Sequence, residues 1–172
     1  MPRKTPAKLS VHDRLIRHDL LEFLRGGQAH ASFEDAVKGF PASLAAEKPA
    51  GAPHSAWQLL EHIRLALNDL LEFCTNPHSQ SRAWPQEYWP SAEGPGNRSN
   101  SATAWKGSVA AICKDTKALE KLLLDPKIDL TAKIPWGDGQ TILREILLAG
   151  DHTSYHVGQL VALRKQLDAW KE

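Results

Sequence analysis

The sequence predicts an all-α protein, a four-helix bundle formed by one domain. Apolar residues recur at helical spacing in four long segments, and the prolines and glycines are concentrated between them. A chain of 172 residues with 42% hydrophobic and 24% charged residues is long enough for one core. No internal repeat and no second domain is evident, so we expect a tail over residues 1–10 and a single domain over residues 11–172.

The first half of the chain contains two of the long helices. Residues 11–25 have a helical apolar pattern that stops at a Gly-Gly pair, which is a common helix end. A short helical segment is expected within residues 32–40, followed by a proline-rich connection. The second long helix begins at Ser55, where Gln58 completes a capping box, and continues to about Cys74.

The second half contains the other two long helices, separated from the first half by an unusually long connection. Residues 75–99 are rich in proline, serine and glycine but also contain Trp84, Tyr88 and Trp89, which argue against disorder. This connection is long enough to cross the length of the bundle. A third helix is expected from about residue 101 until Pro126 stops it, and a fourth over residues 141–168 with Thr141 as its N-cap.

Charge and hydropathy exclude several classes of function. The formal net charge is +1 and both signs are mixed along the chain, so no nucleic-acid footprint is expected. No apolar run is long enough to span a membrane, and no secretory apolar segment is found at the N-terminus, so a cytoplasmic protein is expected. Cys74 and Cys113 both occur in apolar helical patterns and are expected to be buried, reduced thiols.

The predicted fourth helix carries polar side chains on the face that should be buried. His152 and His156 lie about 40° apart on this face, with Glu145 and Gln159 beside them. Burying such groups without partners costs roughly 1–3 kcal/mol each. Histidines at i and i+4 can bind one metal ion, or each can hydrogen-bond to a neighbouring helix with no further role. A third ligand would decide between these alternatives.

The second helix supplies a candidate for that third ligand. His62 lies in the middle of its apolar face and would face the fourth helix if the two pack together. Three nitrogen ligands with an open fourth position are typical of catalytic zinc sites, whereas structural sites are closed. Asp69 lies two turns further along on nearly the same side, where it could be a ligand, a group bound to a ligand, or a solvated residue.

Three segments resemble the DinB-like (YfiT-like) family of metalloenzymes: HSAWQLLEHI around His62, WPQEYWP at residues 84–90, and DHTSYHVGQLVALRKQL at residues 151–167. The likeness extends from about residue 11 to residue 170, and the last segment is the most specific. It implies a four-helix bundle with a long crossover between the second and third helices, often dimeric. It also implies a divalent metal held by His62, His152 and His156.

The leading hypothesis is a metalloenzyme that acts on a small molecule, as a hydrolase or as a transferase using a low-molecular-weight thiol. Zn or Ni is the expected metal because imidazole suits both. Glu145, Gln159 and Asp69 are candidates for orienting the ligands or moving protons, since metal-bound histidines usually donate their other N–H to such groups. The alternatives are a non-catalytic metal-binding or stress-associated bundle, and an interaction module that uses exposed tryptophans.

Overall fold

The computed structural model describes residues 9–90 and 98–170, with backbone only for residues 98–101, and it confirms an all-α fold built on four long helices. No strand occurs in these ranges. The helices are α1 (Val11–Arg25), α2 (Phe33–Val37), η1 (Ala42–Leu44), α3 (Ala56–Thr75), η2 (Gln86–Tyr88), α4 (Arg98–Leu124) and α5 (Ile142–Gln166). Most of the expected N-terminal tail (residues 1–8) and part of the long connection (residues 91–97) lie outside the described residues.

Side-chain caps define where the helices begin. The predicted capping box at the start of α3 is confirmed: the Gln58 amide donates to the Ser55 hydroxyl at 3.3 Å, and the Ser55 amide donates to the Gln58 side chain at 3.1 Å. The predicted N-cap of α5 is confirmed as well, because the Thr141 hydroxyl accepts from the Arg144 amide at 3.2 Å. These bonds satisfy amide groups that have no partner within the helix.

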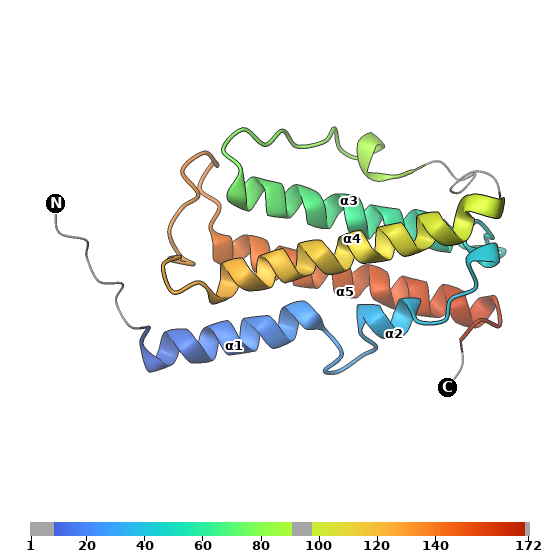
Figure 1. Ribbon diagram of the computed structural model, residues 1–172, viewed down its shortest axis with the longest axis horizontal. Coiled ribbons are helices and arrows are strands. Elements are labelled where there is room, and N and C mark those ends of the chain that lie inside the picture. The colour runs from blue at the N-terminus through green and yellow to red at the C-terminus, as the bar shows by residue number, and fades with distance from the viewer. Residues whose placement is uncertain (1–8, 91–97, 171–172) are drawn as a thin grey trace.

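The long helices do not simply alternate in direction. Figure 1 shows α3 and α4 running the same way, while α1 and α5 run the opposite way. The chain that leaves α3 turns back along it, because Tyr88 is bonded to Asp69 in the middle of α3 and Pro90 to Gln58 near its start. The aromatic segment of residues 84–90 is therefore placed directly against α3.

Helix α3 is the centre of the hydrophobic core. It packs against both α4 and α5, so its first half is buried on more than one face. Leu60, Ile63 and Leu67 are almost completely buried, although they point to other sides of the helix than His62. The position of His62 is thus fixed by packing on both sides of its helix.

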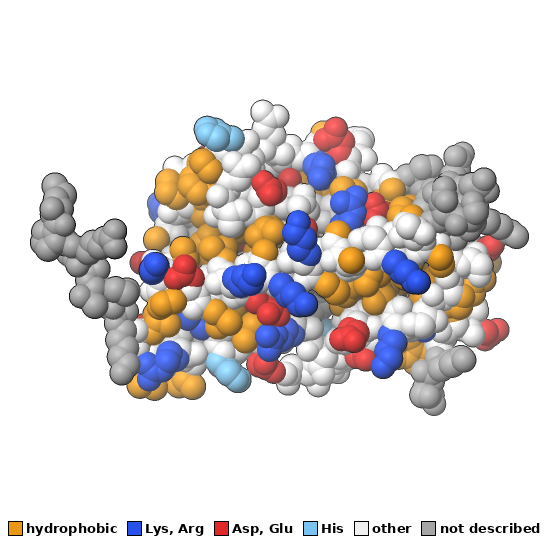
Figure 2. All heavy atoms as spheres, viewed as in Figure 1, with side chains coloured by type: hydrophobic (Ala, Val, Ile, Leu, Met, Phe, Trp, Pro, Cys, Tyr) orange, Lys and Arg blue, Asp and Glu red, His pale blue; other side chains and the backbone are white. Residues whose placement is uncertain are grey.

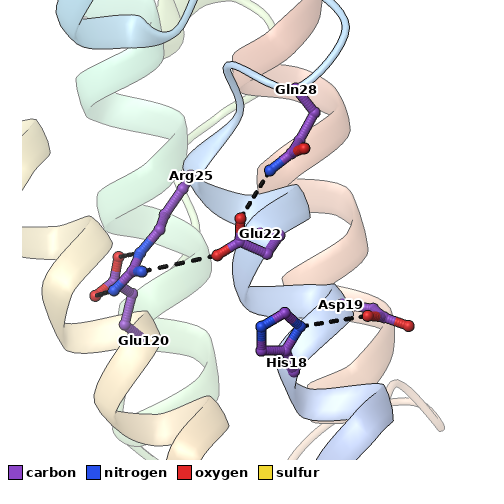
Figure 3. Close-up of polar contacts among 6 residues, drawn as sticks. All are labelled: His18, Asp19, Glu22, Arg25, Gln28 and Glu120. Atoms are coloured by element: carbon purple, nitrogen blue, oxygen red, sulfur yellow. Dashed lines mark hydrogen bonds and ion pairs between the residues drawn. The ribbon is translucent and has the colours of Figure 1, made fainter.

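Helices α1 and α4 are joined by a surface ion pair. Arg25 of α1 donates to both carboxylate oxygens of Glu120 on α4, at 2.8 and 3.1 Å (Figure 3). On the face drawn in Figure 2, basic and acidic side chains are interspersed. No helix in residues 9–90 and 98–170 is long and apolar enough to cross a membrane.

The expectation for the cysteines is half right. Cys74 is buried, as predicted, but Cys113 is exposed and that prediction is wrong. The neighbouring Ile112 is 1% exposed and takes the core position of this turn of α4, and Cys113, about 100° further round the helix, points outward.

Candidate metal centre

Three histidines from two helices converge at one point between α3 and α5. His62, His152 and His156 each offer one ring nitrogen, and these nitrogens all lie within 4.8 Å of one another. His62 is 1% exposed and His156 is 6% exposed, whereas His152 is only partly buried. His62 and His156 are therefore shielded from solvent, and His152 is the most exposed of the three.

Hydrogen bonds at the outer nitrogens determine which ring atoms face inward. The Nδ1 of His62 lies 2.9 Å from the main-chain oxygen of Tyr88, and the Nδ1 of His156 lies 2.8 Å from the Gln159 side-chain oxygen. Because both partners are acceptors, each Nδ1 carries the proton and donates it. The lone pair of each neutral ring then lies on Nε2, the atom left to bind a metal.

The inner nitrogens lie near the spacing that a small cation requires. The Nε2 atoms of His62 and His152 are 3.0 Å apart. A tetrahedral ion with metal–nitrogen bonds of about 2.0–2.1 Å needs its ligand nitrogens about 3.4 Å apart, which a small ring movement provides. Without an ion, a proton on the His152 nitrogen can bridge this gap. A bound metal would replace that hydrogen bond.

The environment keeps the three rings uncharged at neutral pH. Burial, together with the charges that neighbouring histidines would carry, lowers the pKa of His152 and of His156 to about 4. Burial also lowers the pKa of His62, although its bond to Tyr88 acts in the opposite direction. Neutral imidazole is the form that binds metals, so the cluster is ready for a cation without having to release protons at pH 7.

Aromatic rings hold the His62 ring in place. Trp89 stacks on His62 with ring centroids 3.9 Å apart and an angle of 3° between the rings. His54 stacks on the other face of Trp89, at 3.8 Å and 12°. Trp89 is thus held between the two imidazoles, which restricts the orientation of the His62 ring.

A second connection joins His62 to Asp69 through Tyr88. The Tyr88 hydroxyl donates to the Asp69 carboxylate at 2.6 Å, while the main-chain oxygen of Tyr88 accepts from His62. Burial, followed by the bond to Asp69, raises the pKa of Tyr88 to about 12, so its hydroxyl remains a donor. The Asp69–Tyr88 bond thereby positions the carbonyl that orients His62.

Gln159, Asp69 and Glu145, the other residues that the sequence suggested for this site, lie at different distances from the three histidines. Gln159 lies at the centre, bound to His156. Asp69 reaches His62 only through Tyr88. Glu145 is 1% exposed but pairs with Arg144 at 2.7 Å, two turns before His152 on α5 and about 10 Å away along the helix axis.

Several residues near the centre were not identified as site residues from the sequence. His54 and the stacked Trp89 come from loops, and the partly exposed surroundings include Trp84 and Tyr155. The cluster of aromatics in residues 84–89 was the available signal for Trp84 and Trp89. His54 and Tyr155 lie within segments that carry the family resemblance, but no spacing or periodicity marked either of them as a site residue.

Comparisons with family models, with curated proteins and with solved structures found no match for this chain. The fold and the site therefore rest on the chain's own geometry. The geometry shows an all-helical protein with a three-histidine cluster that could hold a metal ion.

Proposed function

We propose that this protein is a divalent-metal-dependent enzyme that acts on a small molecule, as a hydrolase or as a transferase using a low-molecular-weight thiol. The observation that carries the proposal is the arrangement of the three histidines. Their metal-binding nitrogens converge within 4.8 Å, and the outer nitrogens of His62 and His156 are already bound to acceptors. Zn or Ni fits a site made of imidazoles alone.

Each residue of the site has a defined role in this proposal. His62, His152 and His156 hold the ion, and Gln159 and the Tyr88 carbonyl keep two of the rings in the required tautomer. A bound divalent ion would lower the pKa of a coordinated water or thiol and so supply a nucleophile at neutral pH. Access past the partly buried His152 would let a substrate reach it.

Membership of the DinB-like family is part of the same proposal. The three segments that carry the resemblance lie far apart in the sequence, yet His62, Trp89 and the His152/His156 pair contact one another in the structure. This convergence supports the assignment. A homodimer also remains a proposal.

The alternative is a non-catalytic metal-binding bundle. The packing of Tyr88 and Trp89 around His62 favours it, since both cover one side of the site. The partial exposure of His152 favours an enzyme, because a purely structural metal has no need of access.

Activity assays on metal-loaded and metal-free protein would test the proposal. Protein purified without a metal-affinity tag would be loaded with Zn or Ni and assayed for hydrolysis of 4-nitrophenyl acetate and for transfer of cysteine thiol to 1-chloro-2,4-dinitrobenzene. We expect a rate that requires the ion and is lost in His152→Ala. The exposed His18 on α1 provides the control, His18→Ala. Equal rates with and without metal would contradict the proposal.

A further inference from the structure

Two exposed aromatic side chains lie beside the histidine cluster. Trp84 is 67% exposed and Tyr155 is 64% exposed, which makes them the most exposed large apolar residues described in the structure. The Trp84 ring lies 6.3 Å from the His62 ring, and the Tyr155 ring lies 4.9 Å from the His156 ring. Exposed aromatic groups next to a polar centre are typical of binding sites.

The two rings come from different elements, and each lies beside a different histidine of the cluster. Trp84 belongs to the loop that returns along α3, and Tyr155 belongs to α5. These two histidine rings, His62 beside Trp84 and His156 beside Tyr155, are only 4.5 Å apart. Both aromatic rings are therefore within reach of a small molecule bound to a metal at the histidines.

The loop that presents Trp84 is held in place by several contacts. Trp84 packs against Tyr88 with ring centroids 5.3 Å apart, and Tyr88 is itself bonded to α3 through Asp69. The Ala83 amide also donates to the Glu87 carboxylate at 2.6 Å. Trp84 is thus presented on an ordered turn while its own ring remains in solvent.

We propose that Trp84 and Tyr155 are the substrate-binding walls of the metal centre, and that they select small molecules that carry a flat aromatic or unsaturated ring next to a metal-binding group. This inference rests on the proposed function, because it needs an ion at the three histidines. Stacking of a planar ring on exposed Trp and Tyr covers apolar surface and adds a face-to-face or edge-to-face attraction.

Hydroxamates provide probes that separate the metal-binding group from the ring. Acetohydroxamate carries only the chelating group, benzohydroxamate adds a flat ring, and cyclohexanecarbohydroxamate adds a ring of similar size that is not flat. Each would be titrated by calorimetry into the full-length Zn-loaded protein, with the metal content measured after the titration. We expect benzohydroxamate to bind about tenfold more tightly than acetohydroxamate, with a smaller gain for the cyclohexyl compound.

Variants then locate the origin of this preference. Trp84→Ala and Tyr155→Ala should each reduce the advantage of benzohydroxamate, and the double variant should abolish it while acetohydroxamate still binds. Trp136 is 39% exposed and donates its indole N–H to Phe73, away from the histidines, so Trp136→Ala is the matched control and should keep the full preference.

The possible results distinguish the inference from the proposed function beneath it. If Zn and acetohydroxamate bind but the ring gives no advantage, or the advantage persists in the double variant, the aromatic walls are ruled out and the metal site stands. If no Zn binds, or bound Zn does not accept acetohydroxamate, the proposed open metal site fails and the inference fails with it.

Discussion

Helix α5 carries two kinds of polar side chain on its inner face, Arg164 and the histidines of the cluster, and they differ in how their nitrogens are bonded. Arg164 is 4% exposed, and all three of its guanidinium nitrogens donate to main-chain oxygens, those of Asp35, Ala36 and Ala169. His156 lies two turns earlier, about 12 Å along the axis, where the inner nitrogens of the histidine cluster meet one another.

The difference separates a buried polar group that completes its own hydrogen bonding from one whose nitrogens remain available to bind a metal ion. Arg164 satisfies carbonyls at the end of α2 that the helix leaves without partners, so the chain completes its own bonding there. Arg17 does the same for Leu123 at the end of α4. The histidines direct lone pairs toward a common point, and among the described residues the Nε2 atoms of His62 and His152 have no hydrogen-bond partner except each other. A bound cation could take the place of that one hydrogen bond and use the lone pairs of all three rings.

Removing one histidine should have the largest effect on metal binding. His156→Ala deletes one of three ligands, and we expect stoichiometric Zn binding to be lost in a competition titration with a chromophoric chelator. His18→Ala, which removes an exposed histidine from α1, should bind Zn like the wild type. Full Zn content in His156→Ala would rule out the three-histidine site.

Removing the arginine should affect stability instead of metal binding. Arg164→Ala leaves buried carbonyls without donors, and we expect the free energy of unfolding in urea to fall by about 3 kcal/mol. Arg164→Lys should not restore it, because one ammonium group cannot reach carbonyls on both sides. Lys165→Ala, at the exposed neighbouring position, should change it by less than about 0.5 kcal/mol. If Arg164→Ala instead lost Zn affinity at unchanged stability, Arg164 would belong to the metal site and its structural role would be ruled out.

The link between Asp69 and His62 should have an intermediate effect. Tyr88→Phe removes the hydroxyl that binds Asp69 while keeping the ring, and we expect Zn affinity to fall by about tenfold. Asp69→Asn keeps an acceptor for that hydroxyl and should lose less, whereas Asp69→Leu should match Tyr88→Phe. Tyr155→Phe removes a hydroxyl on the other side of the cluster and is the control. An unchanged affinity in Tyr88→Phe would show that the carbonyl is positioned without Asp69.

The buried histidines should make the stability of the metal-free protein depend on pH. Their folded-state pKa of about 4 lies below the unfolded value of 6.5, so the unfolded chain binds more protons between these limits. The contribution of these neutral histidines to the free energy of unfolding is therefore fully present above about pH 6.5, and it is lost as the pH decreases toward 4. We would measure the free energy of unfolding in urea at several pH values after removal of metal. It should decrease with falling pH in the wild type, and decrease less in a His152→Gln/His156→Gln variant. The same pH dependence in both proteins would contradict the conclusion that His152 and His156 are neutral in the folded state.

The cysteines should have the smallest effect on the site. Burial and the nearby Glu145 raise the pKa of Cys74 to about 12, whereas Cys113 is exposed. One thiol per chain should therefore react with Ellman's reagent in the folded protein, and Cys113→Ala should abolish that reaction. Zn binding should be unchanged in this variant, since the site contains only nitrogen ligands. A loss of Zn would point to a sulfur ligand.

Local signals made much of this architecture predictable. The capping residues Ser55 and Thr141 fixed two helix starts because they act within one turn. The i, i+4 spacing of His152 and His156 is likewise a local signal, whereas the mid-helix position of His62 indicated only a candidate third ligand. That His62 lies beside the pair depends on how α3 packs against α5. The position of Glu145 on the same helix face as the histidines was less informative. A shared face shows that side chains point to the same side of the helix, but not how far apart they lie along its axis. Glu145 lies two turns away from the cluster.

The remaining features depend on how distant segments meet. The stacking of Trp89 between His54 and His62 requires the long connection to return along α3 at one particular register. The exposure of Cys113 depends on which turn of α4 faces the core, and Ile112 fills that position. No local sequence pattern indicates either feature, so both could be identified only from the tertiary structure.

The most direct test of the metal centre is a crystal structure of the Zn-loaded protein with data collected on both sides of the zinc absorption edge. We expect one strong anomalous peak between α3 and α5, about 2.0–2.1 Å from the Nε2 atoms of His62, His152 and His156, with an exchangeable ligand in the fourth position. A peak elsewhere, a ring bound through Nδ1, or no peak after loading would contradict the three-histidine site.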